Sequence, residues 1–202
     1  MDKEQVVQIR DEIINATLPN VMFDGWSWQS VINNASELGH DEPAVFAVFP
    51  ERIIDVLDGF ADLADREMLK NLEVQNPEEL RVRDRIRAGV IARLQYLQPH
   101  RDAVRASVGF WGIPTRKPRA AKIVWRTADQ IWNWAGDDAK DYNHYTKRGL
   151  LSGILVSTLL VWLDDESENM RITEEFLDRR IENVLFVGQT IGRFVKGFKK
   201  AS

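Results

Sequence analysis

The fold of this chain is decided by residues 129–165, DQIWNWAGDDAKDYNHYTKRGLLSGILVSTLLVWLDD. The second half of this stretch, Gly149–Leu163, contains no charged residue. A helix that is apolar on every side is expected to be buried on every side. The run is also shorter than the roughly 20 apolar residues that cross a bilayer. We therefore predict that Gly149–Leu163 is the central helix of a soluble helical bundle.

Two interpretations of this helix remain open at the sequence level. It is either plain core or the wall of a cavity or subunit interface, where Gly149 and Gly153 would let another surface approach. The helix before it is expected to stop at Gly136, because glycine adopts the left-handed conformation that ends many helices. Asp137 and Asp138 follow as candidate N-caps, since carboxylates accept hydrogen bonds from the free N–H groups of a first turn.

Composition narrows the function classes. The chain has 202 residues, a net charge of −4 and no cysteine, which excludes a disulfide framework, a zinc-thiolate site and a thiol nucleophile. Its start, Met1–Arg10, is polar and is followed by no apolar signal segment. These features predict a reducing, cytoplasmic setting and one helical domain with an ample core.

Hydrophobic residues recur at helical spacing in most of the chain, and no strand pattern appears, so we predict an all-α fold. The expected helices, besides the central one, are Lys3–Leu18, Trp28–Leu38, Ala44–Phe49, Ile53–Leu72, Glu78–Leu97, Arg101–Trp111 and one that Thr173 caps.

The first four of these helices form a helix-turn-helix arrangement, which resembles the N-terminal domain of TetR-type regulators at Gly25-Trp26 and Phe49-Pro50. Its charges do not suit DNA. From Asp11 through Glu51 there is no lysine or arginine, and phosphate contacts need cations. The expected reading helix also offers no side chain that pairs with a base edge. We therefore predict a degenerate helix-turn-helix and no nucleic-acid partner.

Two segments are basic. Between Arg101 and Arg126 lie seven lysines and arginines against one acid, which is either a solvated surface or a contact for an anion or membrane surface. After Glu182 there is no acid, and cations alternate with apolar residues, as in helices that lie on anionic bilayers. The predicted membrane-binding residues are Ile191, Phe194, Val195, Lys196, Phe198, Lys199 and Lys200.

No catalytic or metal-binding set is recognisable. Di-iron bundles need two Glu-x-x-His pairs with further glutamates on facing helices. Here one such pair, Glu37 and His40, falls in the helix-turn-helix turn, and the other, Asp141 and His144, uses aspartate. There is no Gly-x-Ser-x-Gly turn and no Gly-rich phosphate loop. We expect a protein that is not an enzyme and that uses no cofactor or metal.

A candidate interaction surface lies at the start of the central helix. Asp137, Asp141, Tyr145 and Arg148 are spaced to share one side, and Trp134 precedes them. Aromatic residues and arginine together are typical of protein-interaction hot spots. The other interpretation, a capped helix start with ordinary surface pairs, remains open.

The same region carries a family resemblance. The matching motifs are Trp132-x-x-Ala135-Gly136-Asp137, Asp141-x-Asn143-x-Tyr145-Thr146-Lys147-Arg148, Leu163-x-Asp165-x-Ser167 and Phe176-Leu177-x-Arg179-Arg180-Ile181. Over residues 25–184 the chain resembles the ubiquinone-biosynthesis accessory protein family, the ninth of the coenzyme Q biosynthesis proteins. The resemblance implies a TetR-like helical bundle, a homodimer and an isoprenoid lipid bound in the C-terminal helical domain. It also implies that this lipid is presented to a membrane-associated quinone hydroxylase of the di-iron type.

One set of site residues follows from the resemblance, and the lipid-contacting set follows from the uncharged run Gly149–Leu163. The hydroxylase-facing patch would consist of Ile131, Trp134, Asp141, His144 and Tyr145. The lipid, an isoprenoid or ubiquinone precursor, would contact Leu150, Leu151, Gly153, Ile154, Leu155, Thr158, Leu159 and Trp162.

The expected organisation is a helix-turn-helix-like part (1–75), a ligand-binding helical domain (76–186) and a basic tail (187–202). A bacterial member of the family would be cytoplasmic and peripherally attached to the inner membrane. The competing hypothesis is a TetR-like transcriptional regulator that senses a small apolar ligand.

Overall fold

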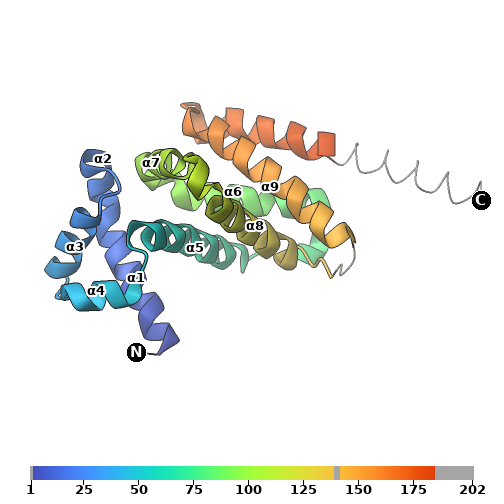
Figure 1. Ribbon diagram of the computed structural model, residues 1–202. Coiled ribbons are helices and arrows are strands. Elements are labelled where there is room, and N and C mark those ends of the chain that lie inside the picture. The colour runs from blue at the N-terminus through green and yellow to red at the C-terminus, as the bar shows by residue number, and fades with distance from the viewer. Residues whose placement is uncertain (1, 139–141, 185–202) are drawn as a thin grey trace, which may run out of the picture. The chain divides into compact units, whose positions relative to one another are not determined.

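The computed structural model describes residues 2–138 and 142–184 (Figure 1). Within these ranges the chain forms helices joined by short turns, with no strand, which confirms the predicted all-α class. The chain divides into two compact units, one made of residues 1–71 and 92–123 and the other of residues 72–91 and 124–202. The predicted division at residues 75 and 186 stays a prediction.

The first unit contains the N-terminal helices and a second segment from the middle of the chain, residues 92–123. Its helices are α1 (Lys3–Thr17), α2 (Val21–Asp24), α3 (Trp28–Glu37), α4 (Glu42–Val48), nearly all of α5 (Ile53–Leu72), the end of α6 (Val82–Leu97), α7 (Arg101–Trp111) and the start of α8 (Lys117–Trp134). Single 3₁₀ turns lie at Leu18–Asn20, Gln98–His100 and Pro114–Arg116.

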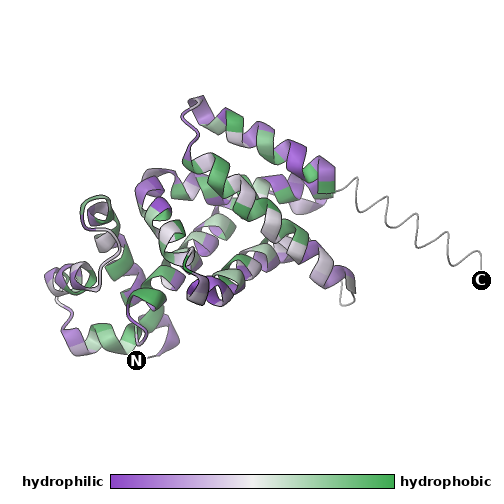
Figure 2. Ribbon diagram, turned by 45° about the horizontal axis from the view of Figure 1, so that its top comes forward, coloured by the Kyte–Doolittle hydropathy of each residue, from purple (hydrophilic) through white to green (hydrophobic). Residues whose placement is uncertain are grey.

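Local sequence explains where these helices start. Asp2, Ser27 and Asp41 each accept a hydrogen bond from a first-turn N–H group of α1, α3 and α4. These helices carry many apolar residues, green in Figure 2. The core of this unit includes the fully buried Ile13 and Phe49. The helix-turn-helix arrangement is therefore present.

Helix α4 offers little chemistry for reading DNA. Its exposed side chains are Glu42, Pro43 and Ala47, and none of them can donate a hydrogen bond to a base. Arg10 directly precedes the segment Asp11–Glu51, which has no lysine or arginine. Its side chain bonds within the protein, because its Nε donates to the carbonyl of Val48 at 2.7 Å.

The second unit is built on α6, α8 and α9 (Tyr142–Leu163), followed by a helical segment over residues 171–184. Two 3₁₀ turns, Pro77–Glu79 and Glu168–Met170, precede α6 and the last segment. Helices α6 and α8 approach closely at Gly89. A Cβ placed there would lie 2.8 Å from Cγ2 of Ile131, so only glycine allows this contact.

The largest differences from the predicted helix bounds are in α8 and α6. The sequence predicted only a short helical pattern near Ile131, but α8 runs for 18 residues from Lys117. Pro118 does not prevent it, because proline is tolerated in the first turn of a helix. The helix predicted from Glu78 begins at Val82, after a 3₁₀ turn that Asn76 caps through the N–H of Glu78.

Candidate functional site

Helix α9 has one buried and one exposed face, which corrects the expectation that it is buried all round. Leu151, Ile154, Thr158 and Trp162 are buried. On the opposite side Val156 and Leu160 are 45% and 49% exposed, and Gly149 and Gly153 face open space. The sequence could not separate these faces, because both are apolar.

The exposed side of α9 continues to the start of the helix. Tyr145, which is 64% exposed, is followed at helical spacing by Gly149, Gly153, Val156 and Leu160. We call these five residues the α9 stripe. Monomeric soluble proteins rarely leave a continuous apolar surface of this kind uncovered, so the stripe is a candidate contact surface.

The predicted lipid-contacting residues are divided between the two faces. Leu151, Ile154, Thr158 and Trp162 lie inside the second unit, Gly153 lies on the stripe, and Leu150 is 38% exposed. Leu155 and Leu159 are half-buried at the edges. A closed channel around the whole set is not what the described residues form.

Thr158 is unusual on the buried face. Its side chain has no exposed surface, and its Oγ1 has no hydrogen-bond partner among the described residues. A second buried oxygen without a partner is Oε1 of Gln130. Thr17 in α1 shows the usual arrangement, since its equally buried hydroxyl donates to the carbonyl of Ile13 at 2.8 Å. Buried polar groups without partners are uncommon and destabilising.

By length and composition, one helix in the described part of the chain could cross a membrane: Asn143–Leu163, with a mean hydropathy of 1.3. The uncharged run Gly149–Leu163 is the second part of this helix. The central helix of a soluble protein satisfies the same criterion.

The first turns of α9 are attached to α8 by a buried ionic network. Arg148 has 1% of its side chain exposed; its Nε donates to Asp129 at 2.5 Å and its Nη1 to Asp137 at 2.9 Å. Its Nη2 donates to Asn133 at 3.2 Å, and Lys147 also donates to Asp137. Arg148 was predicted to lie on an exposed face, so this placement is a correction.

Electrostatics in the network favour the charged forms. Burial alone would raise the pKa of Asp137, but hydrogen bonds from Lys147 and Arg148 outweigh burial and lower it. Asp137 was predicted as an N-cap; its carboxylate accepts hydrogen bonds from Lys147 and Arg148. Gly136, which follows the end of α8, adopts a positive φ of 80°.

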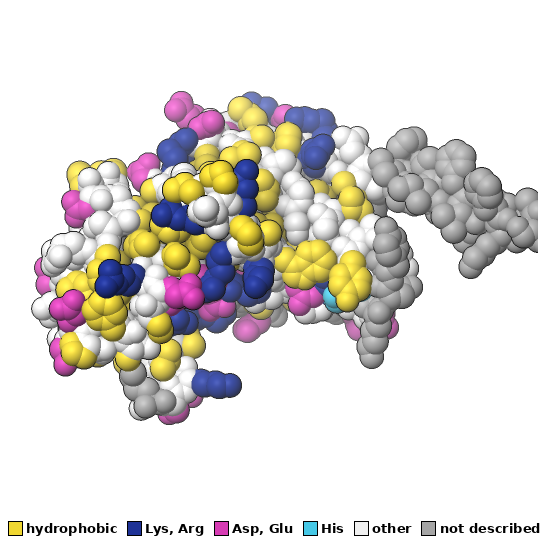
Figure 3. Space-filling model, viewed as in Figure 1, with side chains coloured by type: hydrophobic (Ala, Val, Ile, Leu, Met, Phe, Trp, Pro, Cys, Tyr) yellow, Lys and Arg dark blue, Asp and Glu magenta, His cyan; other side chains and the backbone are white. Residues whose placement is uncertain are grey.

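An aromatic surface lies beside the network. The ring of Tyr145 is 6.2 Å from that of Trp125 and 5.2 Å from that of His144. Figure 3 shows a histidine next to large hydrophobic side chains over this part of α8 and α9. Trp125 was missed by the sequence reasoning. The feature that could have pointed to Trp125 is its position on the preceding helix, 20 residues before Tyr145.

The other predicted patch residues separate. Trp134 is half-buried, and Ile131 is fully buried against Gly89. Ile131 therefore cannot contact a partner at the surface, which corrects that assignment. Asp141 lies outside the described residues, as do the tail residues Ile191, Phe194, Val195, Lys196, Phe198, Lys199 and Lys200.

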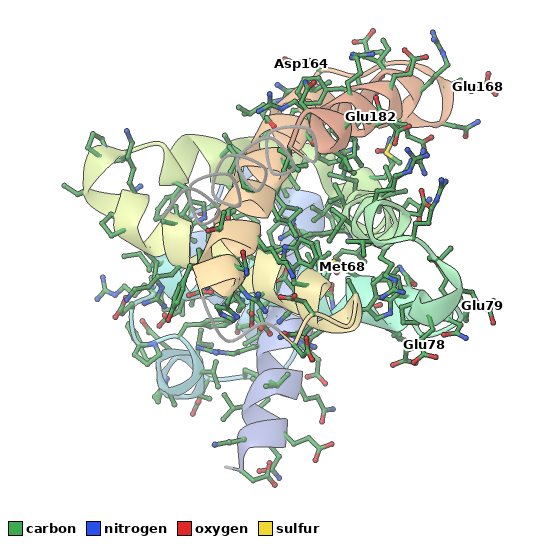
Figure 4. All side chains as sticks on the ribbon, turned by 90° about the vertical axis from the view of Figure 1, so that its right-hand side faces the viewer. Met68, Glu78, Glu79, Asp164, Glu168 and Glu182 are labelled. Atoms are coloured by element: carbon green, nitrogen blue, oxygen red, sulfur yellow. The ribbon has the colours of Figure 1, made fainter. Side chains whose placement is uncertain are left out.

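The far end of α9 is closed by a buried carboxylate. Asp165 accepts hydrogen bonds from the backbone N–H of Ser167 and Thr173, and from both hydroxyls. Burial alone would raise the pKa of Asp165, but these hydrogen bonds lower it to about 2. Its neighbours Asp164 and Glu168 are exposed on the surface (Figure 4). Thr173 was predicted to cap the helix that follows α9. In the structure it donates hydrogen bonds, and Asp165 accepts them.

Comparison with solved structures identifies the class of fold. The TetR transcriptional regulator from Nitrosomonas europaea matches with a TM-score of 0.69 and 24% sequence identity, over 89% of this chain and 99% of that one. The fold is therefore TetR-like, as predicted.

The resemblance to the coenzyme Q biosynthesis family is confirmed as well. The COQ9 family profile matches residues 117–188. The chain is similar to "Ubiquinone biosynthesis protein COQ9, mitochondrial" of Rattus norvegicus (27% identity, 94% of this chain, 62% of that protein) and of Homo sapiens (25%, 94% and 61%). The Drosophila melanogaster protein of the same name is 27% identical over 98% of this chain and 64% of its own length. The chain spans about three fifths of the length of these relatives.

These relatives correct the predicted localisation. They are named as mitochondrial proteins, so the assignment to a bacterial cytoplasm and inner membrane is wrong. That assignment rested on the polar residues Met1–Arg10, and a polar segment does not specify a compartment.

Proposed function

We propose that this protein is a non-enzymatic accessory protein of ubiquinone biosynthesis. It binds an isoprenoid quinone intermediate and presents it to a quinone hydroxylase, acting as a homodimer. The family resemblance supports the pathway, since the relatives are named as ubiquinone biosynthesis proteins without a reaction in the name.

The observation that carries the lipid-binding proposal is the α9 stripe. A polyprenyl tail needs a long apolar surface without charge, and Gly149 to Leu160 provides one about 16 Å long. The open space over Gly149 and Gly153 leaves width for a chain of methyl branches. We therefore place the lipid along the exposed face of α9 rather than in a closed channel.

The test is lipid extraction with mass spectrometry from protein made in a quinone-producing host. Leu160→Asp should abolish the bound lipid, because it puts a charge at the end of the apolar surface, where the lipid would have to desolvate it. Ile172→Asp is the matched control: Ile172 is 47% exposed in the same unit but lies outside α9. Wild-type protein that extracts empty, or equal lipid loss in both variants, would refute the lipid site.

The hydroxylase would bind at Tyr145, His144, Trp134 and the neighbouring Trp125. Truncating a hot-spot aromatic costs about 2 kcal/mol or more in binding, which is roughly thirtyfold in affinity. Tyr145→Ala should show this loss against the purified hydroxylase. Phe23→Ala, which removes a 77% exposed aromatic from α2, should bind as the wild type does. Equal affinities for all three proteins would exclude this surface.

The acidic helix-turn-helix argues against the alternative, a TetR-like regulator. Duplex binding in the micromolar range at physiological salt, weakened by substitutions in α4, would favour the regulator instead.

A further inference from the structure

A second surface, in the first unit, combines exposed apolar residues with exposed lysines. It is the turn between α7 and α8 with the first turns of α8, residues 110–122. We call it the α7–α8 turn. Figure 3 shows hydrophobic and basic side chains gathered over α7 and the start of α8.

We call the exposed apolar residues of the α7–α8 turn the crest. Ile113 is 42% exposed, and Pro114, Pro118 and Ala121 are exposed beside it. Trp111 lies half-buried at the base, 5.1 Å from the ring of Phe110. An amphipathic tryptophan below an apolar crest is the arrangement found where proteins meet the headgroup region of a bilayer.

The charged part flanks the crest. No acidic residue occurs between Asp102 and Asp129, and Lys117 and Lys122 are exposed on either side of Pro118 and Ala121. Arg119 does not contribute to this surface charge, because it pairs with Asp58 at 2.7 Å and Asp55 at 3.3 Å.

The turn is also held in shape. The guanidinium of Arg116 lies 3.6 Å from the ring centre of Phe110, and its Nη1 donates to the carbonyl of Phe110 at 3.2 Å. Pro114 and Pro118 fix the backbone at the start of the 3₁₀ turn and of α8. Because the turn is already ordered, binding through the crest would not cost the conformational entropy that a flexible loop loses.

We propose that the α7–α8 turn docks on anionic lipid bilayers, with Ile113 and Pro114 inserted at the headgroup boundary and Lys117 and Lys122 on the lipid phosphates. Nucleic acid would use the lysines but would leave the apolar crest in water, so the crest favours a bilayer. This docking is separate from the proposed lipid-binding face on α9 and from the tail.

Vesicle flotation of the full chain tests the proposal, with phosphatidylcholine vesicles alone or mixed with phosphatidylglycerol. We expect binding only to the anionic vesicles, weakened by added salt. Each Lys→Glu substitution at 117 or 122 should lower affinity about fivefold or more. Ile113→Glu should lower it on the order of tenfold.

Matched controls change the same charges elsewhere. Lys70→Glu alters a lysine that is 70% exposed, and Val74→Glu alters a valine that is 90% exposed. Both should bind as the wild type does. The proposal would be overturned by variants of the α7–α8 turn that bind vesicles as tightly as the controls. A wild type that binds oligonucleotides but not vesicles would overturn it as well. Lipid extracted from the variants of the α7–α8 turn should equal the wild-type amount, which keeps this result distinct from a failure of the proposed function.

Discussion

Thr158→Val should stabilise the protein, whereas the same substitution at Thr17 should destabilise it. Both side chains are fully buried in helices, so valine preserves shape and burial in each case. The difference is the hydroxyl: Thr17 donates to the carbonyl of Ile13, and Thr158 has no partner among the described residues.

The magnitudes follow from the state of each hydroxyl. An unpaired buried polar group costs about 1–3 kcal/mol, and a made hydrogen bond contributes about 1 kcal/mol net. Thr158→Val should therefore raise the free energy of unfolding by about 1 kcal/mol, and Thr17→Val should lower it by about 1 kcal/mol. For a chain of this length 1 kcal/mol corresponds to about 2–4 °C in Tm.

Thermal and urea unfolding of the two variants beside the wild type measure the contrast. The reasoning is refuted if both variants lose stability equally, since Thr158 would then have a partner. The same variant locates the lipid. A lipid on the α9 stripe leaves the lipid content of Thr158→Val unchanged, while an interior lipid that accepts from this hydroxyl would be lost.

Three further predictions concern the framework around the site. Arg148→Met removes the guanidinium from Asp137, whose side chain is only 4% exposed, and leaves Lys147 to compensate that carboxylate. The free energy of unfolding in urea should fall by about 1–3 kcal/mol, against under about 1 kcal/mol for Arg171→Met at the exposed pair with Glu175. The pKa of Asp165 in the folded protein, about 2, is below its ordinary value of 3.8. Its contribution of about 2 kcal/mol to the free energy of unfolding is therefore present above pH 3.8 and lost as the pH falls through 2. Asp165→Asn should lack this acid dependence. Gly89→Ala should lower stability by about 1–3 kcal/mol, because the added methyl group would contact Ile131. Gly149→Ala, at a position that faces open space, should raise stability by up to about 1 kcal/mol. Equal melting temperatures for the two variants would contradict the close packing of α6 and α8.

Much of the fold could be predicted because most helices have a polar face and clear ends. The predicted bounds of α5 and α7, Ile53–Leu72 and Arg101–Trp111, are those observed. The start of helix α8 is hard to recognise because the prolines and cations near residue 115 are typical of a loop. In the structure Pro118 occupies the first turn, where it breaks no hydrogen bond.

The candidate site was harder to predict, for two physical reasons. In α9 no polar face marks the solvent side, so periodicity could not distinguish Leu151, buried, from Leu160, exposed. Arginine is seldom fully buried, and the acceptors of Arg148 come from another helix and a loop, 19 and 11 residues away. Only the fold brings these partners together.

The α9 stripe joins the two activities that we propose. Tyr145, the exposed anchor for a partner, precedes Gly149 by four residues, or about 6 Å along the helix. A lipid lying from Leu160 to Gly149 would therefore end one turn from a hydroxylase bound at Tyr145, and the transfer would need no large movement of the protein. Arg148 stands between these two residues and fixes this turn of α9 to α8 through Asp129. Because the anchor and the lipid surface share one rigid helix, Tyr145→Ala should abolish delivery to the enzyme while the bound lipid remains.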